Sequence, residues 1–252
     1  VPEASAVPEN GAKVTSEARA AAVATATTAL HPEGPCEVLH VSADDHWMLA
    51  VGGHARLTSL GMPVEAGAAE EDSALSSGLK PWTVRLVPPN IVLTATAMSF
   101  DRTWLATGQE IDGGFGVWLQ QLDARTGRPS GGHRLVARCT LPVRQLTWHP
   151  TSRLLGIATE DGKLLICDRA AEGLDSSEKP KRRDFSLSSE GGVRAVAFDP
   201  AGDLLAGVFS SGLLAVFSVV DGGEVYRAKV APKASTGADT LSMAWRPDGS
   251  CL

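Results

Sequence analysis

A repeated pattern constrains the fold of this chain more than any other feature. The stretch VRQLTWHPTSRLLGIATEDGKLLICD, residues 143–168, returns in close likeness as VRAVAFDPAGDLLAGVFSSGLLAVFS, residues 193–218. A Leu-Ala or Leu-Gly pair marks each unit, and the markers follow one another at intervals of about 50 residues. The marker leucines are Leu49, Leu105, Leu155, Leu205 and Leu252. The sequence therefore predicts four successive units and the opening of a fifth.

Within a unit, the hydrophobic pattern predicts short antiparallel strands. Residues 193–198 alternate with a period of two, and both alternating sets are apolar. A turn at 199–203 leads into a second strand, a glycine turn such as 161–162 leads into a third, and a fourth is expected at 183–188 or 224–230. We expect an all-β chain in which each unit is a four-stranded meander of about 45–50 residues that must be covered on both faces.

Aromatic residues and prolines repeat at the first turn of the units. A large aromatic side chain precedes the marker leucine in four units: Phe100, Trp148, Phe198 and Trp245. In the last three units the residue two positions further on is a proline: Pro150, Pro200 and Pro247. The same slots recur because each unit is expected to pack on a neighbour of its own kind.

This order and spacing of strands and turns resembles that of the WD40 repeat family. The Trp-Asp pair that ends the third strand in that family is eroded here to VWL at 117–119, ICD at 166–168 and VFS at 216–218. The resemblance implies a WD40-like β-propeller, here a partial ring of four units plus the start of a fifth. We expect residues 36–252 to be propeller blades from a larger ring, and residues 1–35 to be a flexible tail or linker rich in Ala, Thr and Pro.

A narrower resemblance rests on the order of the units. A Trp-His-Pro unit, a Pro-x-Gly-x-Leu-Leu-Ala unit and a further Trp-x-Pro unit follow one another from residue 148 onward. This order is similar to that in the N-terminal propeller of eukaryotic replisome adaptors, the WD-repeat and HMG-box DNA-binding proteins. The resemblance implies a role in linking the replicative helicase and polymerase. It transfers no functional residue, because no motif unique to that family occurs in the chain.

Composition sets limits on compartment and partners. The formal net charge is −6, which argues against a surface that binds nucleic acid through overall basic charge. The cysteines are widely spaced and show no metal-ligand pattern, so we expect free thiols in a reducing, intracellular compartment: Cys36, Cys139, Cys167 and Cys251. No apolar run approaches the length of a membrane span, so no membrane partner is expected.

Catalytic, cofactor-binding and metal-binding residues are not expected anywhere in the chain. The cluster Asp44-Asp45-His46 is interpreted as a turn cap, and His149 falls in a turn slot that Asp199 and Arg246 fill in other units. Two glycine-rich stretches, 112–116 and 127–132, lack the features of a phosphate-binding loop. They are interpreted as a hairpin turn and an inter-strand loop, so neither an enzyme nor a small-molecule substrate is expected.

The sharpest local signal is a basic segment, SSEKPKRRD, at residues 176–184. Its cations are Lys179, Lys181, Arg182 and Arg183, and it is expected in a long loop between the third and fourth strands of one unit. Three interpretations stay open. The segment is a nuclear-localisation signal, a weak phosphate contact on DNA, or a solvated surface loop.

Two classes of function fit these observations. The first is a non-catalytic scaffold whose rims and loops dock other proteins, with the nucleus favoured over the cytoplasm and a replisome or chromatin adaptor as its sharper form. A cytoplasmic scaffold for trafficking, the cytoskeleton or translation is the alternative. The second class is a propeller hydrolase, which would need acids or histidines repeated at the strand ends. Those slots hold mainly small residues, so the scaffold is favoured.

Overall fold

The structure, a computed structural model, covers the propeller-like part of the chain with gaps. It describes residues 36–41, 47–52, 56–61, 82–85, 92–151, 153–168, 182–230, 243–250 and 252. Several expectations lie outside the described residues: the tail at 1–35, the turn cap at 44–46, and Lys179 and Lys181 of the basic segment.

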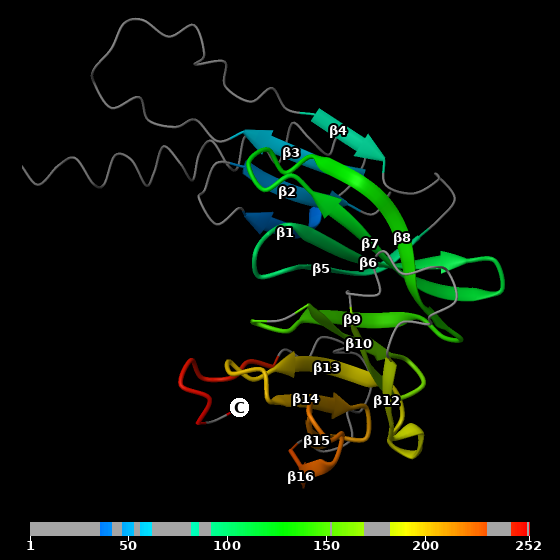
Figure 1. The fold of residues 1–252 in the computed structure, drawn as a ribbon. Helices are drawn as coiled ribbons and strands as arrows, with labels where there is room; N and C mark the ends of the chain where they lie inside the picture. The colour runs from blue at the N-terminus through cyan, green and yellow to red at the C-terminus, as the bar shows by residue number, and fades with distance from the viewer. Residues whose placement is uncertain are drawn as a thin grey trace, which may run out of the picture.

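The described chain forms four sheets of four strands each (Figure 1). The first sheet holds β1 (Cys36–Val41), β2 (Trp47–Gly52), β3 (Arg56–Gly61) and β4 (Trp82–Arg85). The second holds β5 (Leu93–Met98), β6 (Trp104–Ile111), β7 (Gly114–Leu122) and β8 (Pro129–Cys139). The third holds β9 (Val143–Trp148), β10 (Leu154–Thr159), β11 (Lys163–Asp168) and β12 (Arg182–Ser186). The fourth holds β13 (Val193–Phe198), β14 (Leu204–Phe209), β15 (Leu213–Ser218) and β16 (Glu224–Lys229), after a short 3-10 turn at Ser188–Glu190.

Every sheet is an antiparallel meander in which strands pair in chain order, and this confirms the expected unit. Two local expectations differ from the structure. The stretch 127–132 was expected to be a loop, but β8 already begins at Pro129, because Pro129 pairs with Leu122 and extends the hairpin. In the third sheet Arg182 and Arg183 are paired strand residues rather than part of a loop.

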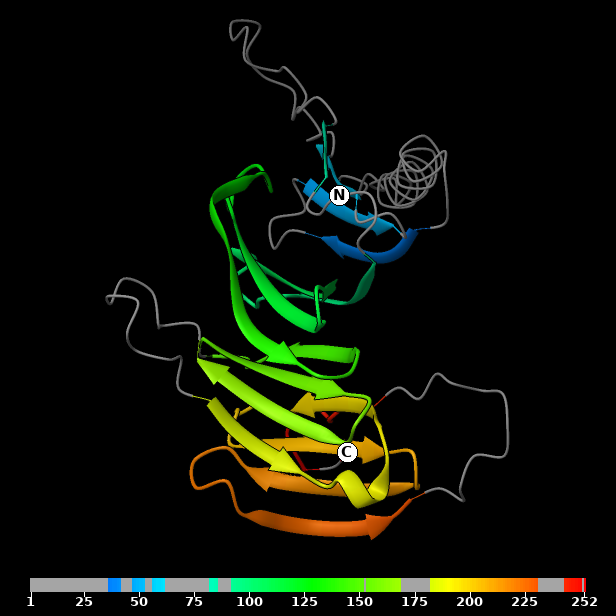
Figure 2. The same ribbon diagram turned by 90° about the vertical axis from the view of Figure 1, so that its right-hand side faces the viewer.

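The middle strands of the third and fourth sheets present apolar side chains to both of their faces. Alternate residues of β11 enter different cores: Leu165 and Cys167 pack toward the second sheet, and Leu164 and Ile166 toward the fourth. This follows from the period-2 geometry of a strand, in which successive side chains point in opposite directions. Sheets of this kind are covered only by stacking, and Figures 1 and 2 show the second, third and fourth sheets lying in succession, face to face.

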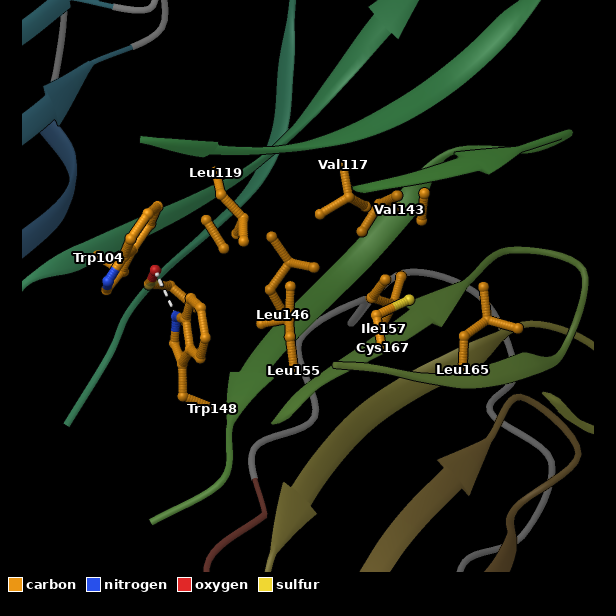
Figure 3. Close-up of a cluster of buried hydrophobic side chains, with 13 residues drawn as sticks. Trp104, Val117, Leu119, Val143, Leu146, Trp148, Leu155, Ile157, Leu165 and Cys167 are labelled. Carbon is orange, nitrogen blue, oxygen red and sulfur yellow. Dashed lines mark hydrogen bonds between the residues drawn. The ribbon is translucent and has the colours of Figure 1, made fainter. Parts of the chain in front are cut away.

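A large cluster of buried apolar side chains lies between the second and third sheets. Its buried members come from β5, β6, β7 and β8 on one side and from β9, β10 and β11 on the other, and Figure 3 shows the cluster. Leu119 of β7 and Leu155 and Ile157 of β10 are almost completely buried. Burying each such side chain stabilises the fold by about 1.5–3 kcal/mol, so this core ties the two sheets together strongly.

Hydrogen bonds join the innermost strands of neighbouring sheets. The indole Nε1 of Trp148 in β9 donates to the carbonyl oxygen of Ala97 in β5 at 3.0 Å (Figure 3). One sheet further on, Trp245 donates in the same way to the carbonyl of Ala197 in β13 at 3.3 Å. These bonds connect residues about 50 positions apart, so the repeat supplies the indole and the matching carbonyl in the same slots.

The repeat slot of the second sheet holds a methionine where an aromatic residue was expected. Met98 pairs with Leu105 just as Trp148 pairs with Leu155 in the third sheet. Phe100 lies two residues further on, in the turn, and its side chain is exposed. The assignment of Phe100 to the repeated aromatic slot is therefore wrong, because it counted the aromatic type and not the strand register.

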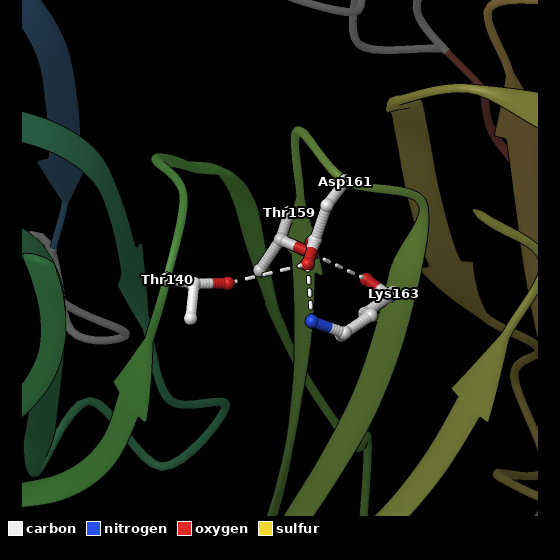
Figure 4. A network of polar contacts seen from close by, with 4 residues as sticks. All are labelled: Thr140, Thr159, Asp161 and Lys163. Carbon is white, nitrogen blue, oxygen red and sulfur yellow. Dashed lines mark hydrogen bonds and ion pairs between the residues drawn. The ribbon is translucent and has the colours of Figure 1, made fainter.

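A polar network fixes the hairpin turn between β10 and β11 (Figure 4). The carboxylate of Asp161 accepts a hydrogen bond from Thr159 Oγ1 at 2.5 Å and pairs with the ammonium group of Lys163. Thr140, in the link between the second and third sheets, also donates to Asp161, at 3.4 Å. Burial raises the pKa of Asp161, but the bonds from Lys163 and Thr159 outweigh it and hold the pKa below its ordinary value.

The Trp148 bond is tested by Trp148→Phe, with Trp245→Phe as the matched control. Both changes remove the same atoms, but the bond of Trp148 is shorter and buried, whereas that of Trp245 is partly exposed. We expect Trp148→Phe to lower the free energy of unfolding by about 1–2 kcal/mol, and Trp245→Phe by less, because an unpaired buried carbonyl is costly. Urea denaturation followed by far-ultraviolet circular dichroism measures both, and equal losses would contradict this assignment.

The Asp161 network predicts a pH dependence of stability. A carboxyl group whose pKa is lower in the folded state stabilises the fold above its unfolded pKa, and the stabilisation is lost as the pH falls through the folded pKa. We expect Asp161→Asn to lower the free energy of unfolding by about 1 kcal/mol at pH 7. The difference from the unchanged chain should narrow below about pH 4 and close on further acidification.

A control for this experiment lies in the second sheet. Asp112 occupies the equivalent hairpin turn, ahead of Gly113, and its side chain is exposed. Asp112→Asn should leave the stability unchanged at both pH values. A loss for Asp161→Asn that stays constant from pH 7 to pH 3 would show that the carboxylate charge is not what holds the turn.

Candidate protein-docking site

The inner ends of three sheets surround a hollow of about 570 Å³, called here the first hollow. Its walls are the last residues of β5, β9 and β13, completed by Ala244 and Trp245. A second hollow of about 610 Å³ adjoins it, and Phe100, Trp148 and Pro150 line both. These are cavities of the size that holds a few side chains of another molecule. Mainly apolar residues line the first hollow, whereas polar and apolar residues line the second.

Four equivalent turns lie at this end of the strands, at 99–103, 149–153, 199–203 and 246–250. Their first slot is structural. Ser99 is buried and its Oγ accepts a hydrogen bond from the backbone N–H of Trp104 at 2.9 Å. Asp199 is buried too, and its Oδ1 accepts from the N–H of Leu204, five residues on, at 2.8 Å. Each side chain therefore closes its own turn.

His149, in the same slot, also links two turns. Its Nδ1 accepts a hydrogen bond from the N–H of Thr151 at 3.2 Å, so the ring proton sits on Nε2, which donates to the carbonyl of Gly202 at 2.9 Å. A Cβ atom at Gly202 would lie 2.0 Å from His149 Cε1, so only glycine fits there. Both ring nitrogens are therefore used in structural hydrogen bonds.

The second slot distinguishes the turn at 99–103 from the other three. The other turns have a proline in this slot: Pro150, Pro200 and Pro247. The turn at 99–103 has Phe100 instead, and 77% of its surface is exposed. An aromatic side chain displayed in water gains nothing from the hydrophobic effect, whereas a proline would restrict the turn at no such cost.

The fourth slot departs from the repeat in the same turn. Gly202 and Gly249 occupy it with φ angles of 85° and 71°, in the left-handed region that glycine adopts freely. The second sheet has Arg102 in this slot, with a φ angle of 59°. A side chain in that conformation costs about 1–2 kcal/mol, and Arg102 is the only non-glycine residue with positive φ in the part of the chain that the structure describes.

Asp101 holds this unusual turn in shape. One oxygen, Oδ1, accepts hydrogen bonds from Ser99 Oγ at 2.6 Å, from the N–H of Thr103 at 3.1 Å and from Thr103 Oγ1 at 2.7 Å. The turn is therefore rigid although it lies on the surface. Phe100 and Arg102 are presented in a fixed orientation at the border of the first hollow.

The charged groups at this end of the strands are unequally paired. Arg153 pairs with Asp168 at 3.0 Å, and Arg246 pairs loosely with Asp248 at 3.5 Å. Arg102 has no carboxylate within ion-pairing distance among the described residues. The hollow thus combines apolar walls with a guanidinium group that is available to a ligand.

The structure does not bring the basic segment to this site. Arg182 and Arg183 belong to β12, at the edge of the third sheet opposite β9, whereas the first hollow lies at the end of β9. In the part of the chain that the structure describes, no group of three His, Cys, Asp or Glu side chains could hold a metal ion. None of the described segments is a helix long and apolar enough to cross a membrane.

Sequence reasoning missed the turn at 99–103 as a candidate site. The signal was present, because aligning the four turns shows Phe where the others have Pro and Arg where two others have Gly. The aromatic at position 100 was instead counted as part of the repeat. Only the strand register separates Met98, which fills the repeated slot, from Phe100, which does not.

Comparison with known proteins identifies the fold. The sequence matches no protein-family model and no curated protein. Sqt1 of Chaetomium thermophilum, solved bound to the N-terminus of the ribosomal protein L10, matches with 18% identity and a TM-score of 0.54 over 79% of this chain and 50% of that one. The β-propeller domain of Cps50 (Swd1) of Myceliophteria thermophila matches with 15% identity and a TM-score of 0.54 over 79% and 56%.

A chain of the mitotic checkpoint complex matches with 13% identity and a TM-score of 0.53 over 77% of this chain and 49% of that one. This chain thus spans about half the length of the structures that it matches. In total 1267 chains of solved structures match, so the likeness identifies a widely used fold and leaves the function to be argued from the site. The expected WD40-like β-propeller fold is confirmed.

Proposed function

We propose that this chain, which has the WD40-type β-propeller fold, is a non-catalytic platform that docks segments of other proteins at the first hollow. The observation that carries the proposal is the chemistry of the hollow. Its walls are mainly apolar, and the buried polar side chains beside it, Ser99, His149 and Asp199, are occupied in closing their own turns. A wall of this kind can bind a peptide side chain but supplies no nucleophile or general base.

The structural neighbours support docking as a use of this fold. Sqt1 was solved bound to the N-terminus of a ribosomal protein, and another neighbour is a chain of a multiprotein checkpoint complex. Both cases concern those proteins and not this chain. They support the docking of protein segments as a use of this scaffold, and the first hollow is the surface proposed for it here.

A variant that fills the hollow tests this function. Ala244 is exposed and lines the first hollow, so Ala244→Trp should block it without disturbing a core. Ala124, exposed in the turn between β7 and β8, is the matched control. In cells, a proximity-labelling enzyme fused to the chain should mark a set of partners that drops about fivefold or more with Ala244→Trp, because a hot-spot contact is lost, and stays the same with Ala124→Trp.

Two results would contradict the proposal. An unchanged partner set with both variants, each shown to be folded by circular dichroism, would remove the first hollow as the docking surface. Hydrolytic turnover of a chromogenic ester by the purified chain, at rates above that of a heat-inactivated control, would favour the propeller hydrolase instead.

The compartment in which the platform works is also a proposal. We infer a nuclear role, as a replisome or chromatin adaptor that links other proteins, and a cytoplasmic scaffold for trafficking, the cytoskeleton or translation is the alternative. The support is the basic segment at 176–184 together with the order of the repeat units.

A reporter fusion tests the compartment. A fluorescent protein carrying residues 173–185 should accumulate in nuclei, because the import machinery recognises clustered lysine and arginine. Replacing Lys179 and Lys181 by serine should abolish the accumulation, and a fusion of residues 122–134, of similar length, is the control. An even distribution of the first fusion between nucleus and cytoplasm would leave the segment as a solvated loop.

A further inference from the structure

The turn at 99–103 has two residues that lower the stability of the fold, and no contact within the described chain offsets this loss. Phe100 exposes most of its ring, and Arg102 holds a left-handed backbone conformation at a slot where two of the equivalent turns have glycine. Strained or exposed residues that persist in a rigid setting are characteristic of binding sites. Proline and glycine, which the repeat has in these slots of other turns, would make the turn more stable. We therefore expect Phe100 and Arg102 to act in a contact outside the turn.

Rigidity makes the pair suitable for recognition. The carboxylate of Asp101 accepts three hydrogen bonds from Ser99 and Thr103, and these bonds fix the loop before any ligand arrives. A preorganised surface loses little conformational entropy on binding.

The residues around the turn indicate the chemistry of the ligand that would bind it. Phe100 lies at the boundary of the two hollows, beside Trp148 and Pro150, so an apolar side chain entering either hollow would contact aromatic surface. Arg102 lines the first hollow with its guanidinium unpaired among described residues. Guanidinium groups bind carboxylates through paired, charge-assisted hydrogen bonds. The complementary ligand thus has an apolar side chain next to one or more carboxylates.

We propose that the turn at 99–103 recognises an acidic peptide segment of a partner protein, with an aromatic or large aliphatic anchor against Phe100 and a neighbouring carboxylate on Arg102. The inference rests on the docking function proposed above and gives the chemistry of its partner. Phe100 supplies contact area and Arg102 supplies selection by charge. The net charge of the chain, −6, opposes an acidic segment at long range, so recognition depends on the local contact with Arg102.

The probe is a fluorescein-labelled nonapeptide, Gly-Ser-Asp-Glu-Phe-Glu-Asp-Ser-Gly, titrated with the whole chain and followed by fluorescence anisotropy. Two relatives of it are compared, one with lysine in place of every acid and one with serine in place of phenylalanine. We expect the acidic aromatic peptide to bind best and to weaken as salt is raised, because a charge pair is screened by ions.

Variants at the two residues separate their roles. Arg102→Gly and Phe100→Pro restore residues that the repeat uses in these slots, so both should fold, which circular dichroism checks. Arg102→Gly should weaken binding of the acidic peptide about tenfold or more, since a hydrogen-bonded charge pair is lost. Arg102→Lys should recover only part of the affinity, because an ammonium group keeps the charge but cannot form the paired hydrogen bonds. Phe100→Pro should weaken the phenylalanine peptide but not the serine peptide.

Arg125→Gly, an equal charge change in the turn between β7 and β8, is the matched control and should change nothing. The proposal is overturned if the lysine peptide binds at least as well as the acidic one, if no peptide binds at millimolar concentration, or if Arg102→Gly leaves the affinity unchanged. A single-stranded oligonucleotide that outcompetes the peptide at Arg102 would overturn it in favour of a phosphate ligand.

The two proposals fail separately. If Ala244→Trp removes partners in cells while the acidic peptide does not bind, the docking platform stands and its partner has other chemistry. If the peptide binds through Arg102 but Ala244→Trp retains every partner, the turn recognises acidic segments and the first hollow as a whole is not the surface that recruits the partners.

Discussion

The third and fourth sheets each have two apolar faces, and a sheet of that kind is stable only when a neighbour covers each face. Alternate residues of β11 enter two separate cores, so the third sheet depends on both the second and the fourth. The tryptophan bonds reinforce this arrangement, since the indole of one unit reaches the inner strand of the unit before it. The stacked sheets, the inner strand ends and the hollows between them all follow from this requirement for mutual cover.

The same requirement limits which residues are available for binding a partner. Residues inside the stacked faces are fixed by packing, and the first slot of three turns is fixed by hydrogen bonding within the turn. His149, Ser99 and Asp199 differ in chemistry but do the same structural work. Positions whose side chains leave the turn carry no such constraint. Phe100 and Arg102 stand at two of these positions, and their departure from the repeat makes them informative.

Much of the fold was predictable because repetition amplifies a weak signal. One short apolar run cannot be assigned with certainty, but several runs at equal spacing with matching turns specify antiparallel meanders. Register was harder to predict. Phe100 was taken for the repeated aromatic, and the start of β8 at Pro129 was taken for a loop, because pairing across a hairpin depends on contacts between distant residues and not on residue type.

The sequence by itself determined the number and kind of units, the apolar character of both strand faces and the structural nature of His149, because these depend on local pattern and repetition. Only the tertiary structure decided that the ends of β5, β9 and β13 enclose a hollow, that Arg102 adopts a left-handed conformation and lacks a carboxylate partner among described residues, and that Arg182 and Arg183 lie in a strand away from it. The physical reason is that a binding surface is made where residues about 50 positions apart meet, and a linear pattern does not contain that geometry.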